Sequence, residues 1–137
     1  MAVAAAITFT WLGMVLGISF LEAPLKFRAP GVTVPLGLGI GRLVFAALNR
    51  IEVLLAVAVW AVLLLGSRST GVLVATGAVS VVLLVQLVAV RPALTRRSDR
   101  VLAGEDGPRS HAHLVYIGLE VLKVAGLITL GALALAG

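Results

Sequence analysis

Three glutamates lie within or at the end of apolar stretches of this chain, where charged side chains are rare. Glu22, Glu52 and Glu120 each belong to a different stretch of mainly Ala, Val, Leu, Ile and Gly. A carboxyl group surrounded by hydrocarbon is costly to ionise, and such groups donate or accept protons in catalysis and in transport. We therefore take these three residues as the candidate catalytic residues.

The stretch that contains Glu120 carries further polar side chains at helical spacing. His113, Tyr116, Glu120 and Lys123 are separated by three, four and three residues. This spacing puts all of them on one face of a helix, while the other faces are apolar. We predict that His113, Tyr116 and Lys123 bind substrate beside Glu120.

The second apolar stretch shows the same geometry. Arg42, Asn49 and Glu52 are separated by seven and three residues, and the third stretch contains Gln86. These polar side chains are expected to face the protein interior, because a charge facing lipid costs roughly 2.5–3.5 kcal/mol. They therefore predict one shared polar cluster, to which Arg42, Asn49 and Gln86 contribute substrate-binding groups.

Simpler structural interpretations stay open for several of these residues. Glu120 and Lys123 are three residues apart and could only neutralise each other. Arg42 could extend its guanidinium to lipid head groups, and Tyr116 could be an interfacial aromatic residue. A lone His113 is more often a hydrogen-bonded core residue than a ligand.

The composition indicates what kind of fold must position these groups. Of 137 residues, 61% are hydrophobic and 12% are charged, against about 25% charged residues in an average soluble domain. A helix of roughly 20 residues spans the hydrocarbon and satisfies its own backbone there. We predict an all-α fold, an integral membrane four-helix bundle in a single domain, with helices at about residues 3–21, 36–65, 70–90 and 114–136.

The distribution of basic residues predicts the orientation of this bundle. Ten of the eleven Lys and Arg residues lie in 22–52 and 91–123, which places them in or near the first and third connections. By the positive-inside rule, loops 22–35 and 91–113 are cytoplasmic and both termini lie on the non-cytoplasmic side of the cell membrane. We expect Pro24 to end the first helix and Pro92 to follow the end of the third.

Several classes of site are excluded or unsupported. The chain has no Cys, which excludes disulfides, thiol nucleophiles and thiolate metal sites. Gly37-x-Gly39-x-Gly41 lacks the strand and turn of a nucleotide loop, so we expect neither a cofactor nor a metal. Anionic membrane lipids explain the net charge of +5 better than nucleic acid does.

Gly13-x-x-x-Gly17 fits close helix contact within one chain or in a homo-oligomer.

Several short motifs resemble those of a known family. They are Trp11-Leu12-Gly13, Ala23-Pro24-x-x-Phe27, Gly41-Arg42-Leu43-Val44-Phe45, Arg91-Pro92 and His113-x-x-Tyr116. Together they resemble a broad family of small four-helix membrane proteins of uncharacterised function, loosely grouped with copper-resistance-type membrane proteins. The resemblance implies the four-helix architecture and supplies no established catalytic residues.

Three functions are compatible with these features. The first is a membrane-embedded acid/base enzyme, an isomerase or a cyclase that can open an epoxide, acting on a lipophilic small molecule. The second is a proton-coupled transporter, for which the one-sided placement of the polar groups is unfavourable. The third is an accessory subunit of a larger membrane complex. We favour the first, because three carboxylates on three helices are more than packing requires.

Overall fold

The computed structural model describes residues 1–66, 69–104 and 111–137, and it is all-helical. Within these residues, four continuous helical segments are long and apolar enough to cross a membrane, namely Ala2–Arg28, Val34–Leu65, Thr70–Leu102 and His113–Ala136. The prediction of four apolar helices is confirmed. Parts of the predicted connections, residues 67–68 and 105–110, lie outside the described residues.

The second and third helices begin where their sequences supply capping groups. α3 (Val34–Leu65) follows Thr33, whose hydroxyl accepts a hydrogen bond from the Leu36 backbone N–H at 3.2 Å, and Pro35 lies in its first turn. α4 (Thr70–Val85) follows Ser69, whose hydroxyl accepts from the Val72 N–H at 3.2 Å. Both caps satisfy backbone donors that have no partner inside the helix.

The first helix continues past Pro24, where the sequence led us to expect its end. It consists of α1 (Ala2–Val15), the π-helical segment η1 (Leu16–Glu22), α2 (Ala23–Leu25) and the 3-10 turn η2 (Lys26–Arg28). The Ala23 N–H donates to the carbonyl of Ile18, five residues earlier. Such local π adjustments re-pair backbone groups that a proline leaves free.

The third helix passes Pro92 in the same way, so the predicted end at residue 90 is wrong. α4 leads into the π-helical segment η3 (Gln86–Val90), where the Arg91 N–H donates to the Gln86 carbonyl. The helix then continues as α5 (Arg91–Leu102). Much of the polar region predicted as a loop is therefore helical, and several basic side chains belong to this helix.

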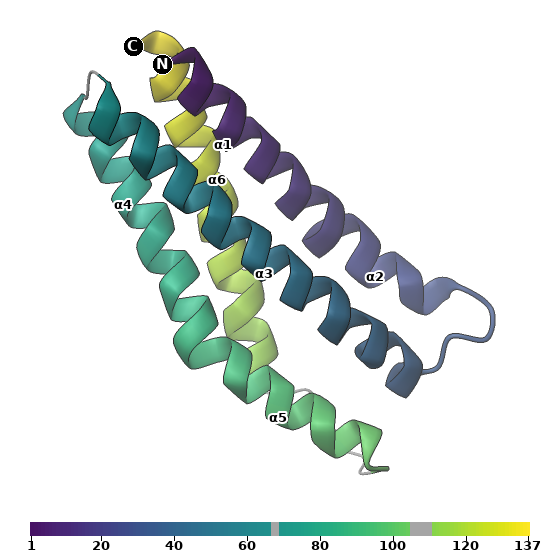
Figure 1. The fold of residues 1–137 in the computed structure, drawn as a ribbon. Coiled ribbons are helices and arrows are strands. Elements are labelled where there is room, and N and C mark those ends of the chain that lie inside the picture. The colour runs from purple at the N-terminus through teal and green to yellow at the C-terminus, as the bar shows by residue number, and fades with distance from the viewer. Residues whose placement is uncertain (67–68, 105–110) are drawn as a thin grey trace.

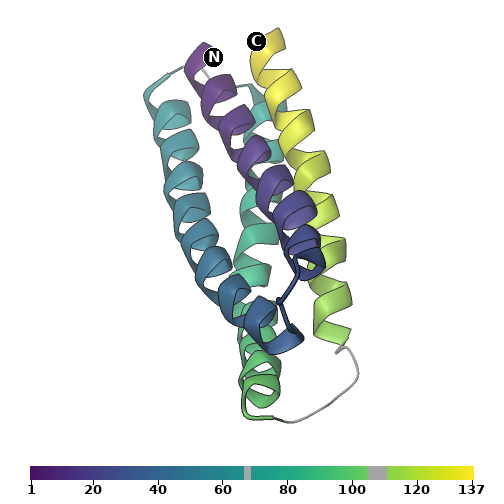
Figure 2. The same cartoon turned by 90° about the vertical axis from the view of Figure 1, so that its right-hand side faces the viewer.

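The helices form a bundle with both termini at one end (Figure 1). α1 lies beside α3 and α6 (His111–Ala136), and α4 lies beside α6 and α3 (Figure 2). The connection between the first two helices and the outer part of α5 lie at the opposite end. This arrangement puts the two predicted cytoplasmic regions together, while the side of the membrane stays a prediction.

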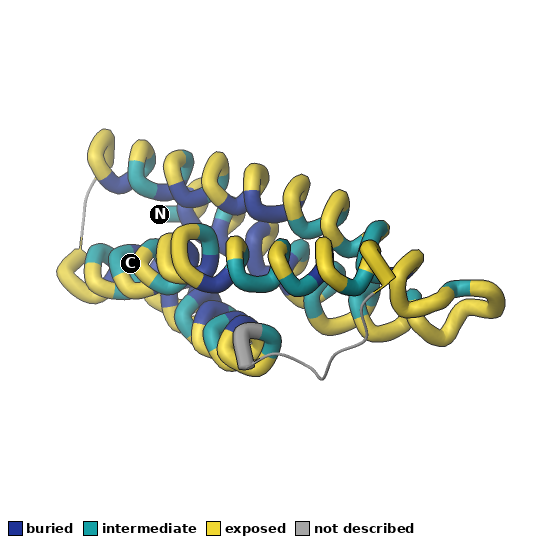
Figure 3. The backbone as a smooth tube through the Cα atoms, turned by 90° about the horizontal axis from the view of Figure 1, so that it is seen from below, coloured by how far each residue is buried: buried dark blue, intermediate teal, exposed yellow. Residues whose placement is uncertain are grey.

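Buried residues face the centre of the bundle and exposed residues face outward (Figure 3). Many exposed residues are large and apolar, including Leu54, Leu84 and Leu122, as expected for helices surrounded by lipid. The interior contains two main apolar clusters, one of Trp11, Leu12, Val15, Ala56, Val79, Leu83 and Leu127, and one nearer the termini of Val59, Leu63, Val72 and Leu130.

Small residues allow close helix contact where side chains would interfere. A Cβ atom at Gly126 of α6 would lie 2.7 Å from Val79 Cγ2 of α4. A Cβ atom at Gly37 of α3 would meet the ring of Phe27, which follows α2. Glycine lets two helices approach closely, and packing rather than hydrophobic burial drives their association in lipid.

Candidate functional site

The side chain of Lys123 is the centre of a buried group of polar residues. Its Nζ atom lies 2.6 Å from Glu52 Oε2 and 2.6 Å from Glu120 Oε1, and it donates to Gln86 Oε1 at 2.8 Å. An ammonium group has three donors, so all three are used. Glu52, Gln86, Glu120 and Lys123 are each no more than 1% exposed.

Two residues of the first helix complete this group. Trp11 Nε1 donates to Glu52 Oε2 at 2.9 Å, and Ser19 Oγ donates to Glu120 Oε2 at 2.6 Å. Gln86 Nε2 also donates to Glu120 Oε1, at 3.2 Å. We name the set the buried ion cluster, and all four membrane-length helices contribute to it: Trp11, Ser19, Glu52, Gln86, Glu120 and Lys123.

The charges in the buried ion cluster are unequal. It contains two carboxyl groups and one ammonium group, so it carries a net charge of −1 when both carboxyls are ionised. Glu52 Oε1 is buried and has no hydrogen-bond partner among the described residues. Because an unpaired charge is costly to bury, one proton on the cluster would balance it.

A cavity of about 670 Å³ adjoins this cluster at the end of the bundle remote from the termini. Its walls come from η1, α2, η2, the first half of α3, α5 and the first turns of α6. Ser19 and Glu120 line it, so they belong both to the buried ion cluster and to the cavity wall. Most of the wall is apolar, with Phe20, Phe27 and Ile117 among its residues.

The predicted site residues other than Glu22 divide into two sets in the structure. Glu52, Gln86 and Lys123 lie in the buried ion cluster behind the wall. The cavity is lined by Arg42, Asn49, His113, Tyr116 and Glu120. Asn49, Glu52, Tyr116, Glu120 and Lys123 of the predicted stripes are buried, while the side chain of Arg42 is 39% exposed. Glu120 lies where the two sets meet.

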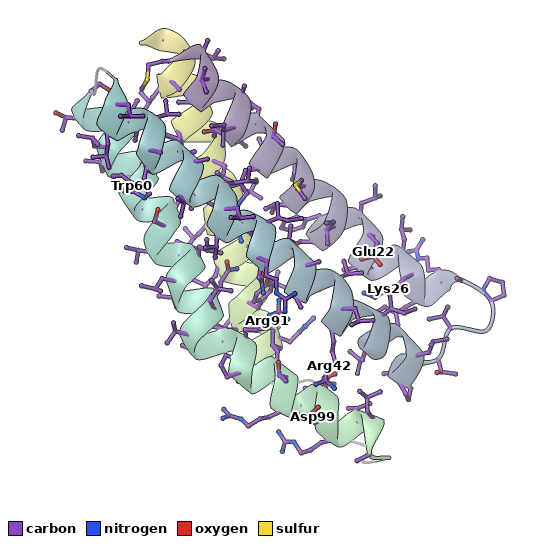
Figure 4. All side chains as sticks on the ribbon, in the orientation of Figure 1. Glu22, Lys26, Arg42, Trp60, Arg91 and Asp99 are labelled. Atoms are coloured by element: carbon purple, nitrogen blue, oxygen red, sulfur yellow. The ribbon has the colours of Figure 1, made fainter. Side chains whose placement is uncertain are left out.

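Glu22 lies apart from the other two candidate carboxylates. Its Oε2 atom is 3.7 Å from Lys26 Nζ, one turn further along the first helix (Figure 4). It belongs neither to the buried ion cluster nor to the residues that line the cavity. Arg42 forms an ion pair with Asp99 of α5 at 2.7 Å (Figure 4). The alternative interpretation of this residue was that its guanidinium extends to lipid head groups.

Arg91 lines the cavity but is not among the site residues that the sequence predicts. Its guanidinium carbon lies 5.0 Å from the centre of the Phe45 ring and 4.7 Å from that of Tyr116, within the range of cation–π attraction. The two rings meet edge to face at 5.9 Å. One sequence feature could have pointed to Arg91 as a site residue, namely its position before Pro92 at the end of an apolar stretch.

Lys26 also points into the cavity, from the opposite wall. Its Nζ atom lies 5.6 Å from the centre of the Phe27 ring and 5.9 Å from that of Phe45. A Cβ atom at Gly41 would be 3.0 Å from this Nζ, so the absent side chain leaves room for the lysine. Trp11 and Ser19 were likewise not predicted as site residues, because an indole and a hydroxyl are common in membrane helices and form no pattern.

No family model, curated protein or solved structure matches this chain. The resemblance drawn from its motifs therefore stays a prediction, and the function must be argued from the site itself.

Proposed function

We propose that this protein is a cofactor-independent membrane enzyme that performs acid/base chemistry on a lipophilic small molecule, with Glu120 as the catalytic residue. The observation that carries the proposal is the position of Glu120. Its carboxyl group is held by Lys123, Gln86 and Ser19, and Glu120 is one of the residues that line a cavity with mainly apolar walls. A fixed carboxyl group beside a bound substrate is the basic requirement of general acid or base catalysis.

The cavity has a size that suits a small molecule. Its volume of about 670 Å³ lies within the range of about 300–1,000 Å³ that is usual for ligand sites. Phe20, Phe27 and Ile117 would hold a hydrocarbon portion. Asn49, Tyr116 and His113 supply polar groups that orient the reacting part.

The residues behind the wall would stabilise the changes of charge at Glu120. When Glu120 donates a proton, the new carboxylate already has Lys123 Nζ at 2.6 Å. Fixed donors of this kind need no rearrangement during the reaction. Glu52 in turn holds Lys123 in place from the other side, so it acts as a positioning residue.

The reaction class follows from these groups. An isomerase moves a proton off one carbon and onto another. An epoxide-opening cyclase protonates the epoxide oxygen as its carbon–oxygen bond breaks, while a nucleophilic group of the same substrate bonds to that carbon and then loses a proton. Both reactions conserve electrons, so no redox partner is required. One carboxyl group that exchanges a proton with the substrate can serve either reaction.

Transport is less well supported by the interior of the bundle. Between the buried ion cluster and the termini, the described interior is formed mainly by the two apolar clusters. The buried polar side chains there are Thr8 and Thr76, and the Thr76 hydroxyl donates to the Val72 carbonyl. A proton or solute path would need polar groups through this half as well.

The experiment uses the purified protein in lipid nanodiscs, incubated in D₂O with the lipid-soluble extract of the cells that express it. High-resolution mass spectrometry follows the conversion of extract components and the incorporation of deuterium at carbon. We expect Glu120→Gln to slow conversion by about 100-fold or more, the usual contribution of a general acid or base. Glu22→Gln removes a carboxylate outside the cluster and should retain the rate. Conversion by Glu120→Gln at the wild-type rate would refute the proposal.

A further inference from the structure

The cavity wall contains guanidinium donors that no described residue satisfies. Arg91 Nε and Nη2 and Arg97 Nε are buried and have no hydrogen-bond partner among the described residues. Both residues belong to α5 and line the cavity. Neither has a carboxylate within 4.0 Å in the described part of the chain, whereas Arg42 pairs with Asp99 and Lys26 lies near Glu22.

Unsatisfied donors of this kind indicate the chemistry of a missing partner. A buried polar group without a hydrogen bond costs free energy, and a guanidinium costs more than a neutral group. The planar fork of arginine matches a carboxylate or a phosphate, which accept two parallel hydrogen bonds. Ser98 Oγ, from the residue that follows Arg97 in α5, is also buried without a partner among the described residues and adds a hydroxyl donor.

Arg91 is also held in position before any ligand binds. Its guanidinium lies against Phe45 and Tyr116, at 5.0 and 4.7 Å from the ring centres. Stacking restricts the side chain, while its Nε and Nη2 atoms have no partner among the described residues and stay available for an acceptor. A preorganised donor loses less entropy when it binds.

The cavity wall changes from cationic to apolar next to these donors. Phe45, Leu94 and Ile117 line the same cavity. Tyr116, which contacts Arg91, precedes Glu120 by four residues of α6, or roughly 6 Å along the helix axis. A head group at Arg91 would therefore leave the adjoining part of the same molecule beside Glu120.

We infer that the ligand of this cavity is an amphiphile with an anionic head group, a carboxylate or a phosphate. Arg91 and Arg97 bind the head group, and the hydrocarbon portion lies against Phe45, Leu94 and Ile117. The inference rests on the proposed function and names its substrate class. The ligand can come from the membrane, as an anionic lipid, or from solution, as an amphiphilic metabolite.

The test measures binding of dodecyl phosphate to the full chain in phosphatidylcholine nanodiscs, by isothermal titration calorimetry. We expect one site per chain, with dodecanol and inorganic phosphate each binding at least about tenfold more weakly. Arg97→Gln should weaken dodecyl phosphate binding by about tenfold, since a hydrogen bond to a charged group is worth at least that factor. Arg97 stacks on no described ring, so this variant is a safer test than Arg91→Gln.

Arg96→Gln is the matched control, because Arg96 is the preceding residue of α5, is exposed and does not line the cavity. It should bind dodecyl phosphate as the wild type does. Equal binding of dodecanol, equal binding of inorganic phosphate, or an equal loss in Arg96→Gln and Arg97→Gln would each overturn the inference.

Two further measurements complete the test. One distinguishes a membrane source of the ligand from a soluble source, and the other distinguishes failure of this inference from failure of the proposed function. Displacement of dodecyl phosphate by dioleoyl phosphatidic acid in the nanodisc would identify a membrane lipid, and failure of displacement would identify a soluble amphiphile; both support an anionic head group. Glu120→Gln should still bind dodecyl phosphate. Loss of binding in Arg97→Gln therefore reports on the head-group site, and loss of conversion in Glu120→Gln reports on the acid/base chemistry.

Discussion

At the scale of single residues, the site depends on how one lysine distributes its three donors. Lys123 contacts Glu52, Glu120 and Gln86 at 2.6, 2.6 and 2.8 Å. Gln86 also donates to Glu120, so it fixes the relative positions of lysine and carboxyl group. The contact between Glu120 and Lys123 expected from their spacing is present, yet it is part of a larger network and does more than neutralise a charge.

We predict that Lys123→Met destabilises the protein more than Glu52→Gln does. Lys123→Met leaves two buried carboxyl groups without a cation, and breaking a buried ion pair in this way costs about 3–5 kcal/mol. Glu52→Gln leaves one ammonium facing one carboxylate, and the amide oxygen can still accept from Trp11 and Lys123. Unfolding in mixed micelles with increasing SDS, followed by circular dichroism, gives both free energies. Equal losses would show that charge balance does not govern the stability of the cluster.

At the scale of helices, two π-helical segments place residues of the buried ion cluster. Ser19 lies in η1 and Gln86 begins η3, and each segment directly precedes a residue–proline step. A π turn adds a residue relative to an α-helix and rotates everything beyond it. Trp11 and Glu22 are 11 residues apart and would share a face over three regular α-helical turns. The π-helical segment η1 lies between them, and Glu22 lies beside Lys26 rather than in the cluster.

We predict opposite effects for two glycine substitutions on α6. A Cβ atom at Gly126 would lie 2.7 Å from Val79 Cγ2, while one at Gly118 would meet no described atom within 4 Å. Gly126→Ala should therefore destabilise the bundle by about 1–3 kcal/mol, as overpacking does. Gly118→Ala should be neutral or stabilise by up to about 1 kcal/mol through helix propensity.

The same SDS titration compares these two variants, and Gly118→Ala is the matched control. Gly126→Ala should also lower the rate of any reaction at Glu120, because α4 leads into Gln86 and α6 carries Glu120 and Lys123. Indistinguishable stabilities would mean that α4 and α6 do not pack closely at this position.

At the scale of the whole molecule, the cationic cavity lies at one end of the bundle and the termini lie at the other. The end with the cavity is the one that the positive-inside rule places at the cytoplasmic face. A cavity at that end would open toward anionic head groups of the inner leaflet or toward cytoplasmic metabolites. The orientation of the chain therefore determines which pool of ligands it meets.

The absence of Cys makes this orientation directly testable with single introduced cysteines. Arg28→Cys at the end of η2 and Thr70→Cys at the start of α4 lie at opposite ends of the bundle, and both positions are exposed. In intact cells, a membrane-impermeant maleimide should label Thr70→Cys and should label Arg28→Cys only after permeabilisation. The reverse pattern would place the cavity on the outer face.

The four helices and the inward stripes of α3 and α6 could be predicted because each depends on the chemistry of individual side chains and on helical period. A charge is costly to expose to lipid wherever it lies along the chain, so Glu52, Glu120 and Lys123 had to face inward together. The continuation of two helices past Pro24 and Pro92 could not be predicted in the same way, since it depends on hydrogen bonds that re-pair across a π turn.

Packing alone decides which of the three candidate carboxyl residues lines the cavity. The sequence makes Glu120 or Glu52 the candidate acid, and the other of these two, or Glu22, the candidate base. In the folded chain Glu52 is held behind the wall by Trp11 and Lys123, Glu22 lies beside Lys26, and Glu120 lines the cavity. Side-chain type and period specify which residues must be buried, but the rotation and approach of neighbouring helices determine which of them lines the cavity.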